Sequence, residues 1–73
     1  MNKIVKLEIL SVERQGDYIY VTVKGGTISF YPRLVPKPLD TLTENYLIEE
    51  TCIQESGDSM HQVTYNFVKR EGV

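Results

Sequence analysis

Residues 18–31 read YIYVTVKGGTISFY, and this stretch decides the fold. In its first half, isoleucine and valine alternate with other residues, and a period of two is typical of a β-strand. Two glycines, Gly25 and Gly26, then separate this run from a second alternating run. A glycine pair in this position predicts a β-hairpin with a two-residue loop.

The side-chain alternation supports this hairpin. A two-residue Gly25-Gly26 loop sets Val23 opposite Ile28, and Val21 opposite Phe30 two residues further along. The larger apolar residues then share one face, as expected for a strand pair that covers a core.

The other face of the hairpin carries aromatic side chains. In the same register Tyr20 lies beside Tyr31, with Tyr18 two residues further along. We expect an earlier strand to add Leu10 and Val12 to this face. The candidate interaction surface therefore comprises Tyr18, Tyr20, Tyr31, Leu10, Lys24 and Arg33.

Two further stretches alternate like strands. Residues 3–12 place Val5, Leu7 and Ile9 two apart, and residues 60–69 do the same with another apolar set. We expect the first and the last strand to form the edges of the sheet, unless the sheet closes into a barrel.

Three prolines within residues 32–38 predict a loop that crosses between strands, because proline cannot donate to a sheet ladder. Three apolar residues are expected to anchor this loop to the core: Leu34, Val35 and Leu39.

Residues 41–54 fit two structures. Thr41 and Glu44 have the spacing of a helix capping box, which favours a short helix around residues 41–53. As a strand, the segment would place Tyr46, Ile48 and Cys52 on one face, and residues 55–58 would form the loop to the last strand. We favour the strand, because the acidic residues near position 50 would oppose the helix dipole.

These patterns predict a mostly β protein with one domain spanning residues 1–73. The expected architecture is a single small antiparallel sheet or a five-stranded barrel of the size of SH3 and OB domains. The alternative is an α+β fold with the short helix described above.

Charge is distributed unevenly along the chain. Residues 1–37 carry six basic and three acidic side chains, whereas residues 38–73 carry two basic and seven acidic side chains. The net charge is −2, and residues 38–68 contain no lysine or arginine. This stretch predicts a candidate acidic surface: Glu44, Glu49, Glu50, Glu55 and Asp58.

No catalytic or cofactor-binding motif is present: the chain lacks GxGxxG, P-loop, CxxC, HExxH and GxSxG patterns. Cys52 and His61 are the only cysteine and the only histidine, which leaves few ligands for a metal site. We therefore expect no enzyme activity, no cofactor and no metal.

The sequence favours a small protein-binding module or accessory protein that acts through a sheet face or an edge strand. A chain of 73 residues has a small core, so we expect self-association or docking on another protein. The alternative is a barrel that binds single-stranded nucleic acid through tyrosines and basic side chains. We expect a cytoplasmic protein without membrane contact, of the kind that viruses and mobile elements make to modulate a host protein.

Overall fold

The computed structural model describes residues 2–54 and 61–72. The described chain is mostly β, as predicted, and its strands form one antiparallel sheet in the order β3-β2-β1-β4-β5. The five strands are β1 (Asn2–Gln15), β2 (Tyr18–Val23), β3 (Gly26–Phe30), β4 (Tyr46–Gln54) and β5 (His61–Lys69).

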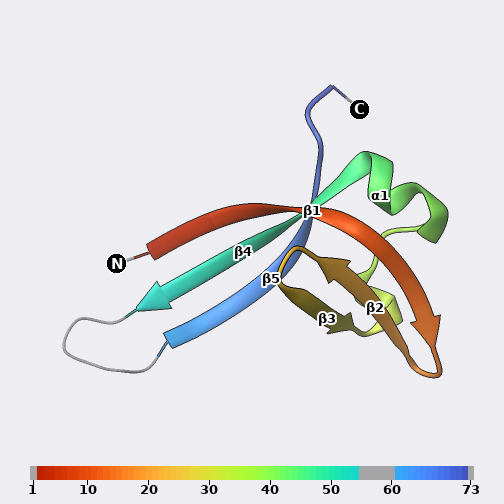
Figure 1. Cartoon of the computed structure of the whole chain (residues 1–73), viewed down its shortest axis with the longest axis horizontal. Helices are drawn as coiled ribbons and strands as arrows, with labels where there is room; N and C mark the ends of the chain where they lie inside the picture. The colour runs from red at the N-terminus through yellow and green to blue at the C-terminus, as the bar shows by residue number, and fades with distance from the viewer. Residues whose placement is uncertain (1, 55–60, 73) are drawn as a thin grey trace.

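The first strand lies in the centre of the sheet and not at its edge, which corrects our expectation. The N-terminal half of β1 pairs with β4, and its C-terminal half pairs with β2. The edges are therefore β3 and β5. In Figure 1, β1 runs through the whole molecule and joins an arm made with β4 and β5 to the β2–β3 hairpin.

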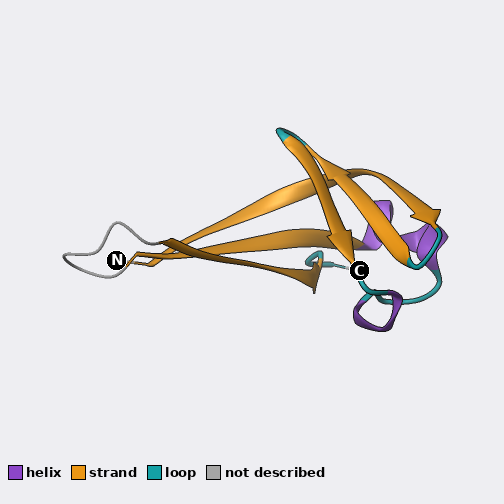
Figure 2. Cartoon of the chain, turned by 90° about the horizontal axis from the view of Figure 1, so that it is seen from below, coloured by secondary structure: helices purple, strands orange, loops and turns teal. Residues whose placement is uncertain are grey.

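A β-bulge at Leu10 lets β1 pair with β4 on one side of the bulge and with β2 on the other. The pairing with β2 shifts by one residue between Ile9 and Ser11, so Leu10 has no direct partner and is 60% exposed. The extra residue reverses the alternation, and Ile9 and Val12 both pack on the core side. The strand bends, and the sheet curls into a half-barrel, as seen from the side in Figure 2.

The predicted hairpin is present, but its loop lies one residue earlier than expected. Lys24 and Gly25 form the turn, and Val23 pairs directly with Gly26. Gly25 adopts a φ of +100°, which a residue with a side chain rarely adopts. The register therefore differs by two residues, which leaves every side chain on its predicted face. The direct partner of Val21 is Ile28, not Phe30.

Residues 32–45 cross from β3 to β4 in three short helical turns, which Figure 1 shows at one end of the sheet. Two of the three predicted anchors pack on the core, whereas Leu34 is 57% exposed. The turns are η1 (Pro32–Leu34), η2 (Leu39–Thr41) and α1 (Leu42–Asn45).

Residues 41–54 combine both predicted structures, because the four-residue helix α1 leads directly into the long strand β4. The capping-box interpretation was wrong. The Thr41 side chain makes no cap, and its Oγ1 hydroxyl donates a hydrogen bond to the Pro38 carbonyl oxygen at 2.7 Å. Burial of Leu42 against the core holds this turn in place.

One cluster of buried side chains holds the two halves together. The rings of Phe30 and Phe67 lie 4.7 Å apart between centroids, so β3 and β5 meet across the interior although their backbones do not pair. The eight buried residues of the cluster are Ile9, Ile19, Val21, Val23, Phe30, Val35, Leu42 and Ile48.

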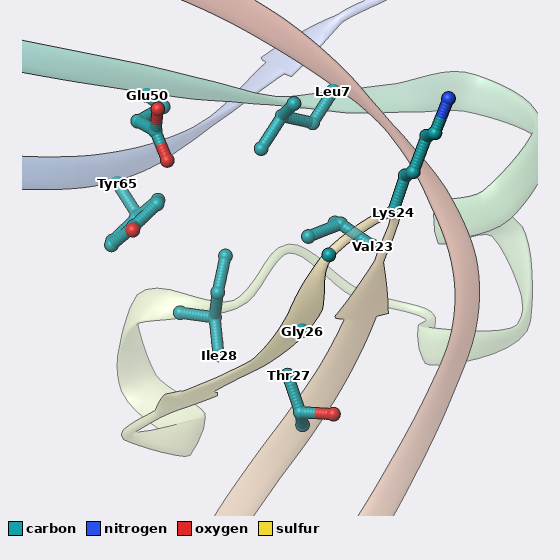
Figure 3. Close-up of a pocket in the computed structure, with 9 residues that line it drawn as sticks. Leu7, Val23, Lys24, Gly26, Thr27, Ile28, Glu50 and Tyr65 are labelled. Atoms are coloured by element: carbon teal, nitrogen blue, oxygen red, sulfur yellow. The ribbon is translucent and has the colours of Figure 1, made fainter.

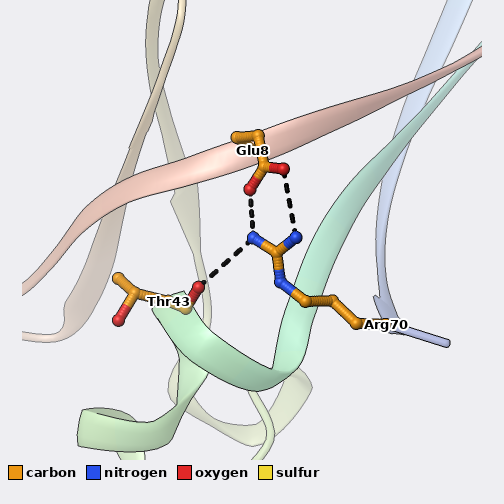
Figure 4. A network of polar contacts seen from close by, with 3 residues as sticks. All are labelled: Glu8, Thr43 and Arg70. Carbon is orange, nitrogen blue, oxygen red and sulfur yellow. Dashed lines mark hydrogen bonds and ion pairs between the residues drawn. The ribbon is translucent and has the colours of Figure 1, made fainter. Parts of the chain in front are cut away.

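An ion pair fastens the chain after β5 to β1 and α1. The Arg70 guanidinium donates to both carboxylate oxygens of Glu8, and one of its nitrogens also donates to the Thr43 carbonyl oxygen at 3.4 Å (Figure 4). Hydrogen bonding and charge from Arg70 lower the pKa of Glu8. The pair therefore stabilises the fold at neutral pH, and this contribution is lost as the pH falls through the lowered pKa.

The turn position predicts opposite effects of alanine at the two glycines. We expect Gly25→Ala to destabilise the fold by about 1–2 kcal/mol, because the new side chain opposes a positive φ. Gly26→Ala should stabilise it by about 0.5–1 kcal/mol, because Gly26 begins β3 with open space around it. Urea unfolding measures both changes. An equal loss of unfolding free energy in the two variants would indicate that both glycines lie in the turn, which would contradict the observed register.

Candidate interaction surfaces

Three tyrosines gather on the outer face of the hairpin, and we call Tyr18, Tyr20 and Tyr31 the tyrosine patch. Tyr18 and Tyr20 alternate along β2 with the buried residues Ile19 and Val21, so they face away from the core. The ring of Tyr18 lies 6.4 Å from that of Tyr20 and 5.6 Å from that of Tyr31. Tyr18 is 41% exposed and Tyr31 is 53% exposed, so the patch is open to a partner.

Arg33 adds a positive charge to the tyrosine patch. Its guanidinium carbon lies 5.5 Å from the centre of the Tyr31 ring, within the range of a cation–π contact. The turn η1, which follows β3, places Arg33 at this position. The structure thus brings together four of the six residues predicted for the interaction surface.

The other two predicted residues lie elsewhere. Ile9 pairs with Val23, and the bulge at Leu10 shifts the register by one further residue, so the residues opposite Tyr20 and Tyr18 are Glu13 and Gln15 rather than Leu10 and Val12. Gln15 donates a side-chain hydrogen bond to Glu13 at 3.0 Å, so a polar pair flanks the patch.

Lys24 lies apart from the tyrosine patch in the hairpin turn, next to a groove in the concave side of the sheet. This groove, of about 410 Å³, separates the turn from the inner face of β1, β4 and β5 (Figure 3). Leu7, Glu50 and Tyr65 line one wall. The sequence analysis did not identify it, because its walls come from five strands whose packing no local pattern reveals.

Glu50 and Tyr65 form the polar part of the groove. They are direct partners in the β4–β5 ladder, and both side chains are half-buried. Burial raises the pKa of Tyr65, and a hydrogen bond to Glu50 together with the charge of Glu50 raises it further. The raised pKa favours the protonated form of the Tyr65 hydroxyl beside the Glu50 carboxylate.

The predicted acidic residues do not form one surface within the described chain. Glu49 and Glu50 are neighbours in β4 and point to opposite faces of the sheet, and Glu44 lies exposed on α1. Glu55 and Asp58 lie outside the described residues. Within residues 2–54 and 61–72, no three histidine, cysteine or acidic side chains lie close enough to hold a metal ion.

Comparisons of the chain with protein-family models, curated proteins and solved structures found no match. Among the described residues, no helix has the length and apolar character needed to cross a bilayer.

The Glu50–Tyr65 contact predicts how the tyrosine titrates. Glu50→Gln should lower the pKa of Tyr65, because it removes the negative charge that opposes formation of the phenolate. NMR titration of the individual tyrosine rings measures this pKa. Glu49→Gln is the matched control, since Glu49 points to the opposite face. A Tyr65 pKa that is unchanged by Glu50→Gln would contradict the contact.

Proposed function

We propose that this chain is a non-enzymatic protein-binding module or accessory protein that acts through the tyrosine patch and Arg33. The observation that carries the proposal is the clustering of three tyrosines and an arginine on an exposed sheet face. Tyrosine and arginine dominate the energetic centres of protein interfaces, because they bury a large apolar area and still satisfy polar groups. We propose a cytoplasmic setting, since the single cysteine excludes an intrachain disulfide.

The free edge of β5 supports the same function. β5 is nine residues long and contains no proline, and among the described residues it has a partner strand on one side only. Edge strands of this kind can pair with an extended segment of another chain through backbone hydrogen bonds. The edge would give such a partner affinity, and the exposed side chains beside it would give specificity.

A second copy of the chain is the simplest partner. Only eight side chains form the buried core of the described residues, and a small core gains stability from association. The tyrosine patch can meet itself across a two-fold axis, because aromatic rings pack well against one another.

We expect the protein to sediment as a dimer or larger species at tens of micromolar. Tyr31→Ser should weaken this association by about tenfold, as expected for truncation of an exposed aromatic anchor. Ile4→Ser is the matched control, because Ile4 is 61% exposed but lies on the distant β1–β4 ladder. A monomer with a melting temperature independent of concentration would contradict self-association.

A second candidate function is binding of single-stranded nucleic acid. The specific observation in its favour is that the tyrosine patch lies beside Arg33, since bases stack on aromatic rings while a basic group meets the phosphate. Small five-stranded barrels bind oligonucleotides on a comparable face. The charge of the protein opposes this function, because the net charge is −2 and Glu13 lies opposite Tyr20, and negative charges repel the phosphates of nucleic acid.

We therefore expect no oligonucleotide binding tighter than about 10⁻⁴ M at physiological salt. Fluorescence anisotropy with a labelled single strand measures it. Micromolar binding that weakens with salt and is lost in Tyr20→Ala and Arg33→Ala would reverse the order of the two functions.

A further inference from the structure

The concave groove holds a carboxylate without a cation. Glu50 lies on the inner face of β4, in line with the buried Ile48, where an apolar residue would be expected. Among the described residues, the ion pair that forms is Arg70–Glu8, and it lies away from the groove. Tyr65 is the direct ladder partner of Glu50 and supplies no positive charge. A half-buried carboxylate in this state favours a cationic partner.

The walls beside Glu50 suit a long basic side chain. Leu7 lies in one wall, and Val23 and Ile28 lie in the other, with all three directed into the groove (Figure 3). Lysine and arginine place their methylene stems along apolar surfaces of this kind while the charged end reaches a polar group. The Tyr65 ring next to Glu50 offers a further contact to the cation. At about 410 Å³, the groove falls in the range of roughly 300–1,000 Å³ that is usual for binding pockets.

The protein's own Lys24 does not fill this place. Lys24 lines the rim of the groove, but its side chain extends away from Glu50 in Figure 3. It makes no ion pair with Glu50 in the part of the chain that the structure describes. Its charge repels a cation at the mouth of the groove, so Lys24 and Glu50 should influence binding in opposite directions.

We propose that the groove binds one arginine or lysine side chain of a partner protein, with the charged end on Glu50 and Tyr65 and the stem against Leu7, Val23 and Ile28. The proposal rests on the protein-binding function argued above and assigns a chemistry to the partner. Charge complementarity within the groove supports it, because Glu50 lines the groove and the side chain of Lys24, on the rim, extends away from Glu50.

An NMR titration of the full-length, ¹⁵N-labelled protein tests the proposal. The probes are three capped pentapeptides, each with four alanines around a central arginine, lysine or citrulline. Citrulline has nearly the shape of arginine but no charge. We expect the arginine and lysine peptides at millimolar concentration to shift the amide signals of Leu7, Gly26, Glu50 and Tyr65. The citrulline peptide should leave these signals unchanged.

Two single substitutions separate charge recognition from a structural effect. Glu50→Gln should weaken binding of the arginine peptide by about tenfold, because a charged hydrogen bond becomes a neutral one. Lys24→Gln should strengthen it by about twofold, because a like charge leaves the rim. If Glu50 had only a structural role, the two substitutions would not change the affinity for the arginine peptide in opposite directions. The protein would also bind the citrulline peptide as well as the arginine peptide.

Three results would overturn the proposal: equal binding of citrulline and arginine, unchanged binding in Glu50→Gln, or no shifts at the groove in any titration. Shifts confined to the tyrosine patch would also overturn it while supporting the protein-binding function. Failure of that broader function is measured separately, because the sedimentation experiment with Tyr31→Ser does not involve the groove.

Discussion

The structure depends on one long strand that belongs to two halves of the sheet. β1 pairs with β4 over its first half and with β2 over its second half, and the bulge at Leu10 lets it bend between them. Without the extra residue, a strand that buries Ile9 would turn Val12 outward. The bulge keeps both residues on the core side, and the curled sheet then covers its own interior.

The curled sheet covers only part of its own surface. The hairpin and the helical turns cover the interior near Phe30 and Leu42, whereas the arm of β1, β4 and β5 extends beyond them in Figure 2. Ile4 and Val63 remain exposed on this arm. The described part of the chain therefore presents two sheet faces and two unpaired edge strands, β3 and β5, to possible partners.

The two candidate surfaces differ in chemistry because they lie on opposite sides of the hairpin. The tyrosine patch is aromatic and ends in the positive charge of Arg33, whereas the groove is lined by apolar side chains around the negative charge of Glu50. A partner that contacted both surfaces would need an acidic or aromatic segment at the tyrosine patch and a basic side chain in the groove.

The sequence by itself determined the strands, the hairpin and the faces of its side chains, because alternation and turn residues act over a few neighbouring positions. It therefore predicted that Tyr18, Tyr20 and Tyr31 share a face. It could not determine that β1 lies in the centre, that Leu10 forms a bulge, or that Lys24 begins the turn. These features depend on how distant strands share one core, and a shift of two residues in register leaves every alternation pattern intact. The groove around Glu50 has the same origin, because its walls meet only when β1, β2, β3, β4 and β5 have curled around a common interior.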